Sequence, residues 1–195
     1  MKIGKAPSIG KIDNEIIKAL KTSLTTVITD LFSRIIETEG FPKQWEMAEI
    51  RIFYKKGNKT NINNYRPICS SSNVNRIFMK VIKNRIYGKL DLNQGIEKAG
   101  FRRDFSTIGH INEHRIEVHF IFVGSNNAFD SVQHAEFWQT LANQGIPRKW
   151  IKIIRAIYKK VKAYVRTDVK GQVFEIEGDV RQGDPLSPNL FKTAY

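Results

Sequence analysis

The residues best suited to chemistry form one run near the end of the 195-residue sequence, Arg181-Gln182-Gly183-Asp184-Pro185-Leu186-Ser187-Pro188. Gly183 allows the main chain to approach a ligand closely or to take a positive φ. Asp184 and Pro185 predict a helix N-cap and the first helical residue, and Pro188 falls in the first turn, where a missing N–H is tolerated. Gln182, just ahead of a helix start, suits contact with a sugar, base or phosphate. The run predicts a backbone pocket, although ordinary strand-to-helix turns also use Gly, Asp and Pro.

The charge of the chain favours a polyanionic partner. The sequence has 32 Lys and Arg against 19 Asp and Glu, which gives a formal net charge of +13. Nucleic acid is the commonest partner of such a chain, and a solvated basic surface without a specific partner is the alternative. No basic amphipathic helix stands apart in the sequence, so a membrane surface is disfavoured.

Cysteine and hydropathy restrict the compartment. Cys69 is the single cysteine, so neither a disulfide framework nor a zinc site of paired cysteines is expected. No apolar stretch is long enough to span a bilayer, and residues 1–10 lack the apolar core of a signal peptide. The sequence predicts an intracellular protein of the nucleus or cytoplasm, neither secreted nor membrane-bound.

Periodicity predicts the elements that position the pocket. Helical spacing of apolar residues predicts a helix or helical pair over 13–39, and further helices over 74–90, 107–115, 131–143 and from Trp150 to Tyr158. Extended structure is predicted over 48–56, 64–68 and 119–123, and in a hairpin over 161–177 with its turn at Lys170-Gly171. Strands and helices mixed in this irregular order favour an α+β fold over a doubly wound sheet.

The strand over 48–56 is predicted to be half-buried, with Glu49 and Arg51 on the face opposite its apolar residues. It leads into a turn with two cations at its tip, Lys55-Lys56-Gly57-Asn58. Lysine and arginine suit phosphate, but such residues are more often simply a solvated basic turn.

Several short motifs follow one another along the chain. They are Lys5-Ala6-Pro7, Phe41-Pro42-Lys43-Gln44-Trp45, the strand ending in Lys55-Lys56-Gly57, Asn64-Tyr65-Arg66-Pro67-Ile68, Gly100-Phe101-Arg102, Ala128-Phe129-Asp130-Ser131-Val132 and the run first described. Each is weak alone. In this order they resemble the reverse transcriptase domain of non-LTR (LINE-type) retrotransposons over almost the whole chain.

The resemblance implies a right-hand polymerase of α+β fold. Residues 1–195 would form one incomplete domain, with fingers over about 1–115 and part of a palm over about 116–195. The implied partners are an RNA template, a DNA primer and a deoxynucleoside triphosphate, with no membrane. The implied reaction is nucleotidyl transfer, for which the family uses Mg²⁺ held by carboxylates.

The resemblance also implies roles for single residues. Lys55, Lys56 and Arg66 would hold the triphosphate of the incoming nucleotide. Gln182 and Gly183 would line the pocket around the nucleotide and the template base.

Three further residues take roles from the same resemblance. Phe129 matches a bulky residue under the nucleotide sugar, where its ring would crowd a 2′-hydroxyl; its alternative is a core aromatic. Arg102 and Arg103 would follow the nucleic-acid backbone, or would simply be exposed.

The sequence departs from the family where catalysis depends on carboxylates. Gly124 occupies the position of the metal-binding Asp, and Asp130 matches a non-catalytic Asp suited to capping a helix. No Asp-Asp pair occurs before the last residue, Tyr195. We therefore expect no intact catalytic or metal-binding residue, no Asp-Asp hairpin or thumb, and no polymerase activity from this chain alone.

Other functions remain open on the sequence. The chain is alternatively a non-catalytic RNA- or DNA-binding remnant, or the product of a decayed element with no role. A remote alternative is a zinc metallopeptidase, because His110, Glu113 and His114 fit the H-x-x-E-H signature.

Overall fold

We describe the chain from a computed structural model, which places residues 9–10, 12–95, 98, 100, 106, 134–159, 161–176 and 183–194. The helix predicted over 107–115 and the strand predicted over 119–123 lie outside the described residues. None of the described helices is long and apolar enough to cross a membrane.

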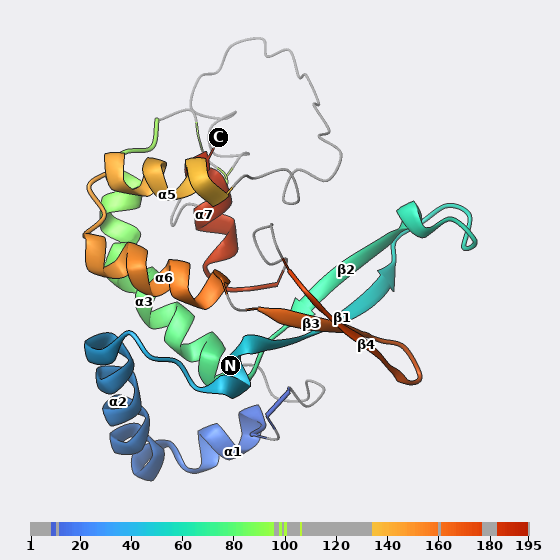
Figure 1. The fold of residues 1–195 in the computed structure, drawn as a ribbon, viewed down its shortest axis with the longest axis horizontal. Coiled ribbons are helices and arrows are strands. Elements are labelled where there is room, and N and C mark those ends of the chain that lie inside the picture. Colours follow the sequence, from blue (N-terminus) through green and yellow to red (C-terminus); the bar gives the residue numbers. More distant parts are fainter. Residues whose placement is uncertain are drawn as a thin grey trace.

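Six α-helices are described, and they form one half of the molecule (Figure 1). They are α1 (Asn14–Ala19), α2 (Lys21–Thr38), α3 (Asn73–Leu92), α5 (His134–Asn143), α6 (Arg148–Lys159) and α7 (Ser187–Ala194), with short 3₁₀ turns η1 (Lys43–Glu46) and η2 (Ile62–Asn64). The predicted helical pair over 13–39 is confirmed as α1 and α2, and the helix predicted over 74–90 is α3.

A four-stranded sheet forms the other half, in the order β2-β1-β3-β4. The strands are β1 (Met47–Tyr54), β2 (Tyr65–Ser70), β3 (Lys162–Arg166) and β4 (Lys170–Glu175). Two antiparallel hairpins, β1–β2 and β3–β4, are joined by parallel pairing of β1 with β3. In Figure 1 both hairpins project away from the helices. The mixed helix-and-sheet architecture agrees with the predicted α+β class.

The predicted turn at Lys170-Gly171 is wrong, because both residues belong to β4 and the turn occupies 167–169. A Cβ atom on Gly171 would lie 3.0 Å from the carbonyl oxygen of Val165. This glycine therefore marks a close approach of two strands.

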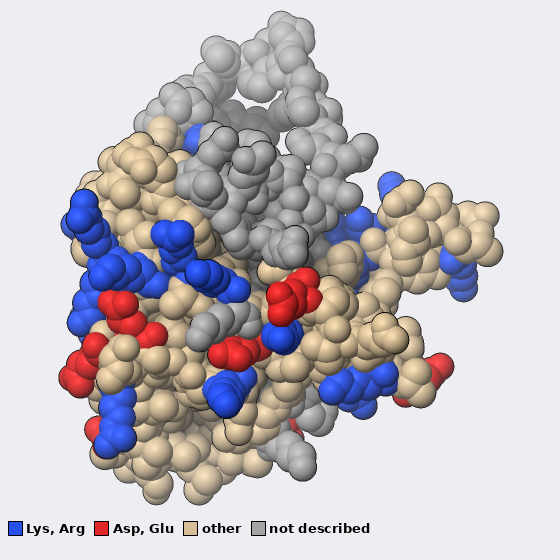
Figure 2. Space-filling view, viewed as in Figure 1, with Lys and Arg blue, Asp and Glu red and all other residues tan. Residues whose placement is uncertain are grey.

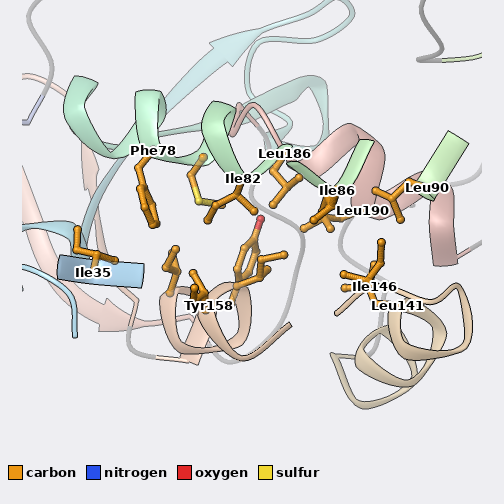
Figure 3. Packing of buried hydrophobic residues seen from close by; sticks show 14 of the residues in the cluster. Ile35, Phe78, Ile82, Ile86, Leu90, Leu141, Ile146, Tyr158, Leu186 and Leu190 are labelled. Carbon is orange, nitrogen blue, oxygen red and sulfur yellow. The ribbon is translucent and has the colours of Figure 1, made fainter. Parts of the chain in front are cut away.

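The core is built around α3, whose buried residues recur every three or four positions (Figure 3). Helices α2, α5, α6 and α7 pack on it with the fully or nearly fully buried Ile35, Leu141, Ile153, Ile154 and Leu190, joined by Leu186 just before α7. Trp45, in η1, packs its ring 5.4 Å from that of Phe78 on α3. Since β1 begins two residues after Trp45, this contact fixes the root of the sheet on the helical core.

Glu49 is buried rather than on a solvent face, with 5% of its surface exposed. Its carboxylate accepts hydrogen bonds from Arg51 Nε at 2.6 Å and from the Tyr164 hydroxyl at 2.9 Å. Arg166 Nη1 lies 3.5 Å from the same carboxylate. Tyr164 and Arg166 belong to β3, so this group of four residues holds the two hairpins together.

The surroundings of Glu49 shift the pKa of two side chains, Glu49 itself and Tyr164. Burial would raise the pKa of Glu49, but the hydrogen bonds from Arg51 and Tyr164 and the charges of Arg51 and Arg166 outweigh it and lower that pKa. Burial and the hydrogen bond to Glu49 raise the pKa of the Tyr164 hydroxyl. A carboxyl with a lowered pKa stabilises the fold above its ordinary value, 4.5, and this contribution is lost as the pH falls through the folded-state pKa.

We expect Glu49→Gln to reduce the free energy of unfolding at pH 7 by about 1–3 kcal/mol, the range for losing charge-assisted hydrogen bonds in a buried site. The difference between wild type and variant should shrink below pH 4.5. Urea denaturation across this pH range measures both effects.

The matched control is Glu175→Gln, which removes a carboxylate that pairs with Lys162 at 3.1 Å on an exposed surface. Its cost at pH 7 should stay below about 1 kcal/mol. Equal costs for the two variants would show that the Glu49 group does not join the hairpins.

Candidate functional site

The loop that joins β1 to β2 is held by its own hydrogen bonds. Lys55 N donates to Asn64 O at 2.8 Å, and the Asn64 side chain donates to Asn58 O at 2.8 Å. Gly57 has φ +95°, and a Cβ atom there would lie 2.7 Å from Asn64 Nδ2. The sequence Gly57-Asn58 therefore gives a defined loop shape rather than a loose tip.

Two tyrosines brace the base of this loop. Tyr54 and Tyr65 are paired across the strands, and their rings pack edge to face with centroids 5.5 Å apart. The Tyr54 hydroxyl donates to Gly57 O at 2.6 Å, and the Tyr65 hydroxyl donates to Lys59 O at 2.8 Å.

The three predicted phosphate-binding cations lie at the outer end of this hairpin. Lys55 and Lys56 open the loop, and Arg66 lies on β2 opposite Phe53. All three cations are exposed. Within the described ranges, no carboxylate is recorded in an ion pair with them. The arrangement brings three exposed cations onto one hairpin end.

Gly183 lies directly against β2. Its φ is +110°, and a Cβ atom there would meet the Cys69 carbonyl oxygen at 2.7 Å and Ile68 Cγ2 at 3.3 Å. Both the backbone conformation and the contact exclude a side chain. The contact point is three residues along β2 from Arg66. The structure thus joins the pocket run of the sequence to the strand that carries one of the predicted cations.

The other end of the run is anchored in the core. Leu186 and Leu190 are completely buried there. The Ser187 hydroxyl lies 3.2 Å from that of Tyr158 on α6 and shares a hydrogen bond with it. The described part of the pocket run, residues 183–188, is therefore fixed both to the helical core and, at Gly183, to the sheet.

The prediction that Asp184 caps the helix and Pro185 begins it is wrong by two residues. Helix α7 begins at Ser187, and the Leu186 carbonyl accepts the first helical bond, from Leu190 N at 3.1 Å. The Asp184 carboxylate instead accepts a hydrogen bond from Leu186 N at 2.8 Å, as in an Asx turn. Pro188 does fall in the first turn, as predicted.

The remaining predicted residues lie outside the described residues: Gly124, Phe129, Gln182, Arg102, Arg103, His110, Glu113 and His114. In the part of the chain that is described, no cluster of three or more His, Cys, Asp or Glu side chains could hold a metal ion. The contact of Gly183 with Cys69 and the Glu49 group were not found from the sequence. The one sequence signal for the contact with Cys69 was Gly183 itself, which precedes Asp184-Pro185.

Gly183→Ala should destabilise the fold by about 1–3 kcal/mol, because it combines an unfavourable φ with a clash against backbone. The control is Gly88→Ala on α3, where a Cβ atom meets nothing within 4 Å. That change should stabilise by about 0.5–1 kcal/mol, as alanine favours helix. Chemical denaturation measures both, and a neutral Gly183→Ala would contradict the contact.

Comparison with known sequences supports the resemblance. Residues 54–195 match the family described as reverse transcriptase (RNA-dependent DNA polymerase). The chain is 27% identical over 96% of its length to a probable RNA-directed DNA polymerase from transposon BS of Drosophila melanogaster. It is 26% identical over 96% of its length to the RNA-directed DNA polymerase from mobile element jockey of the same species.

A third relative is the retrovirus-related Pol polyprotein from type-1 retrotransposable element R2 of Nasonia vitripennis, 28% identical over 87% of the chain. The chain spans 22%, 22% and 17% of the length of these three relatives. The family match covers most of the chain and includes the whole β1–β2 loop, β2 and the pocket run. The chain therefore belongs to the reverse transcriptase (RNA-dependent DNA polymerase) family, as its resemblance to the non-LTR retrotransposon domain indicated.

Proposed function

We propose that this chain forms the fingers and part of the palm of a retrotransposon reverse transcriptase, and that it binds a deoxynucleoside triphosphate and an RNA template. The observation that carries this proposal is the contact of Gly183 with β2 at Cys69. It sets the pocket run beside the strand that carries Arg66. Positive charge and a side-chain-free stretch of backbone are the two features that a nucleotide site needs.

Each part of the site has a proposed task. Lys55, Lys56 and Arg66 neutralise the triphosphate, with the arginine able to donate two parallel hydrogen bonds to one phosphate. Gln182 and Gly183 line the pocket beside the nucleotide and the template base.

Residues outside the described part keep their predicted tasks as proposals. Phe129 lies under the nucleotide sugar, and Arg102 and Arg103 follow the nucleic-acid backbone. The division into fingers over about 1–115 and palm over about 116–195 is likewise proposed.

The residues present do not fit the family's divalent metal ions. Two ions in a nucleotidyl transfer site need several carboxylate oxygens. Gly124 offers none, the sequence contains no Asp-Asp pair, and one oxygen of the Asp184 carboxylate accepts a hydrogen bond from Leu186 N. We therefore propose that residues 1–195 by themselves catalyse no polymerisation.

The triphosphate site is tested with the triple variant Lys55→Gln, Lys56→Gln, Arg66→Gln and a fluorescent dATP analogue in Mg²⁺. Binding should weaken about tenfold or more, since one charge-assisted hydrogen bond contributes about 1.5–3 kcal/mol and 1.4 kcal/mol is tenfold.

The control for this test removes the same number of charges elsewhere, through Lys18→Gln, Arg34→Gln and Lys80→Gln on α1, α2 and α3. These three cations are also exposed. Equal binding by the two variants would refute the triphosphate site and favour a general basic surface.

Catalysis is tested by primer extension on an RNA template with all four deoxynucleotides and Mg²⁺. We expect no extended product from the wild-type chain or from Gly124→Asp, because a single added carboxylate cannot hold two metal ions. An active reverse transcriptase in a parallel reaction checks the substrates. Extension by the wild-type chain would overturn the proposed inactivity.

The second candidate function is a non-catalytic nucleic-acid-binding remnant. The net charge of +13 and the Gly124 substitution favour it. It differs from the first candidate in requiring no triphosphate site, so the binding test above separates the two.

A further inference from the structure

Helix α6 carries a dense row of cations on its outer side. Arg148, Lys149, Lys152 and Arg155 are all exposed, and the helix contains no Asp or Glu. At 100° per residue these four positions fall within about a third of the helix circumference. We call these four residues the α6 basic face. The opposite side of α6 is buried in the core through Ile153, Ile154, Ile157 and Tyr158.

This arrangement opposes the stability of the helix. Arg148 and Lys149 are the first two residues of α6, where the helix dipole is positive and cations are unfavourable. Lys152 is four residues from Arg148 and three from both Lys149 and Arg155, so these like charges repel each other. Over the described ranges, no carboxylate is recorded in an ion pair with these four residues. Helix formation therefore does not explain why these four cations cluster. A bound anion would reduce the repulsion between them.

The surroundings extend the positive charge at one end and limit it at the other. Lys89 of α3 reaches Gly145, in the turn before α6, and donates to its carbonyl at 3.0 Å. At the far end of the helix, Lys159 lines a cavity of about 180 Å³ together with Glu39 and Glu46. The strongest positive field thus lies over the first two turns of α6.

The α6 basic face is remote from the proposed triphosphate site. Figure 1 places α6 among the helices, on the side opposite to the outer end of the β1–β2 hairpin. Figure 2 shows Lys and Arg side chains gathered over this helical half, with a smaller group of Asp and Glu side chains beside them. A ligand at the hairpin end therefore leaves the α6 basic face uncovered in this view.

We propose that the α6 basic face binds the phosphate backbone of RNA, as a second surface outside the nucleotide site. Arg148 and Arg155 are seven residues, or about 10 Å, apart along the helix. A nucleic-acid strand places about three phosphates over that length. A membrane surface fits poorly, because the large apolar residues of α6 pack on the core, Trp150 and Ile151 partly buried and the others more deeply. The choice of RNA rests on the proposed function, since an RNA-dependent polymerase must hold that polyanion.

The sequence-based statement that no basic amphipathic helix stands apart is corrected by this helix. Apolar spacing predicted α6 through its buried residues, and the charges between them were not assigned to a face. The missed signal was the run Arg148-Lys149-Trp150-Ile151-Lys152, in which cations recur at helical spacing without a carboxylate.

The test uses the full chain carrying Arg148→Gln, Lys149→Gln, Lys152→Gln and Arg155→Gln. Fluorescence anisotropy with a short fluorescein-labelled RNA is measured between about 50 and 200 mM salt. Affinity at the lower salt should fall about tenfold or more. The slope of log affinity against log salt should become shallower by about 2, as each lost single-strand contact removes about 0.7.

The control is a variant with the same loss of two Arg and two Lys, namely Lys18→Gln, Arg34→Gln, Lys80→Gln and Arg85→Gln. These cations are exposed on α1, α2 and α3, and their loss should change RNA affinity much less. The thermal midpoint of the α6 variant should equal or exceed that of wild type, since it removes repulsion. Equal RNA binding by the two variants, or loss of binding with a lowered midpoint, would overturn the proposal.

Two further measurements separate this inference from the proposed function. The α6 variant should bind the dATP analogue as wild type does, whereas the triple variant at Lys55, Lys56 and Arg66 should not. Wild type should bind RNA more tightly than poly-glutamate or anionic vesicles. Equal binding of poly-glutamate or vesicles would overturn the choice of RNA, and it would leave the proposal of the triphosphate site unaffected.

Discussion

The parallel pairing of β1 with β3 is the constraint on which the rest of the structure depends. These strands are more than a hundred residues apart in sequence, and their pairing joins the two hairpins into one sheet. Backbone hydrogen bonds alone would allow the pair to slip by a residue. The buried Glu49 carboxylate fixes the register, because Tyr164 and Arg166 of β3 both reach it. Trp45 then ties the root of β1 to the helical core.

The candidate site is shaped by two anchors rather than by a deep cavity. The pocket run is held in the core through Leu186 and Ser187 and touches β2 through Gly183. The exposed cations lie beyond that contact, on a hairpin whose loop is closed by its own hydrogen bonds. Because the anchors hold the backbone and the cations stay in solvent, the surface keeps a defined shape. Burying the cations would cost free energy.

Local pattern predicted most helices and strands, because apolar spacing and proline or glycine signals act within a few residues. It failed where the answer depends on partners far away in sequence. Glu49 looks like a solvent-facing residue until β3 covers it, and Gly171 looks like a turn residue until Val165 approaches it. Asp184 has the correct cap chemistry but bonds Leu186 N, two residues on. The order of the short motifs along the chain predicted the family, because several weak motifs in one order are together more specific than any one of them.

The uneven length of the sheet has a mechanical consequence. Strand β3 pairs with β1 from Met47 to Ile50, so from Arg51 outward the β1–β2 hairpin continues without a third strand among the described residues (Figure 1). Two strands alone resist bending less than a sheet does. We therefore expect the outer part of the β1–β2 hairpin to bend more easily than its base. The loop keeps its shape during such bending, because its own hydrogen bonds hold it. A small bend near Arg51 carries Lys55 and Lys56 through the largest displacement, while Gly183 stays pressed against the root.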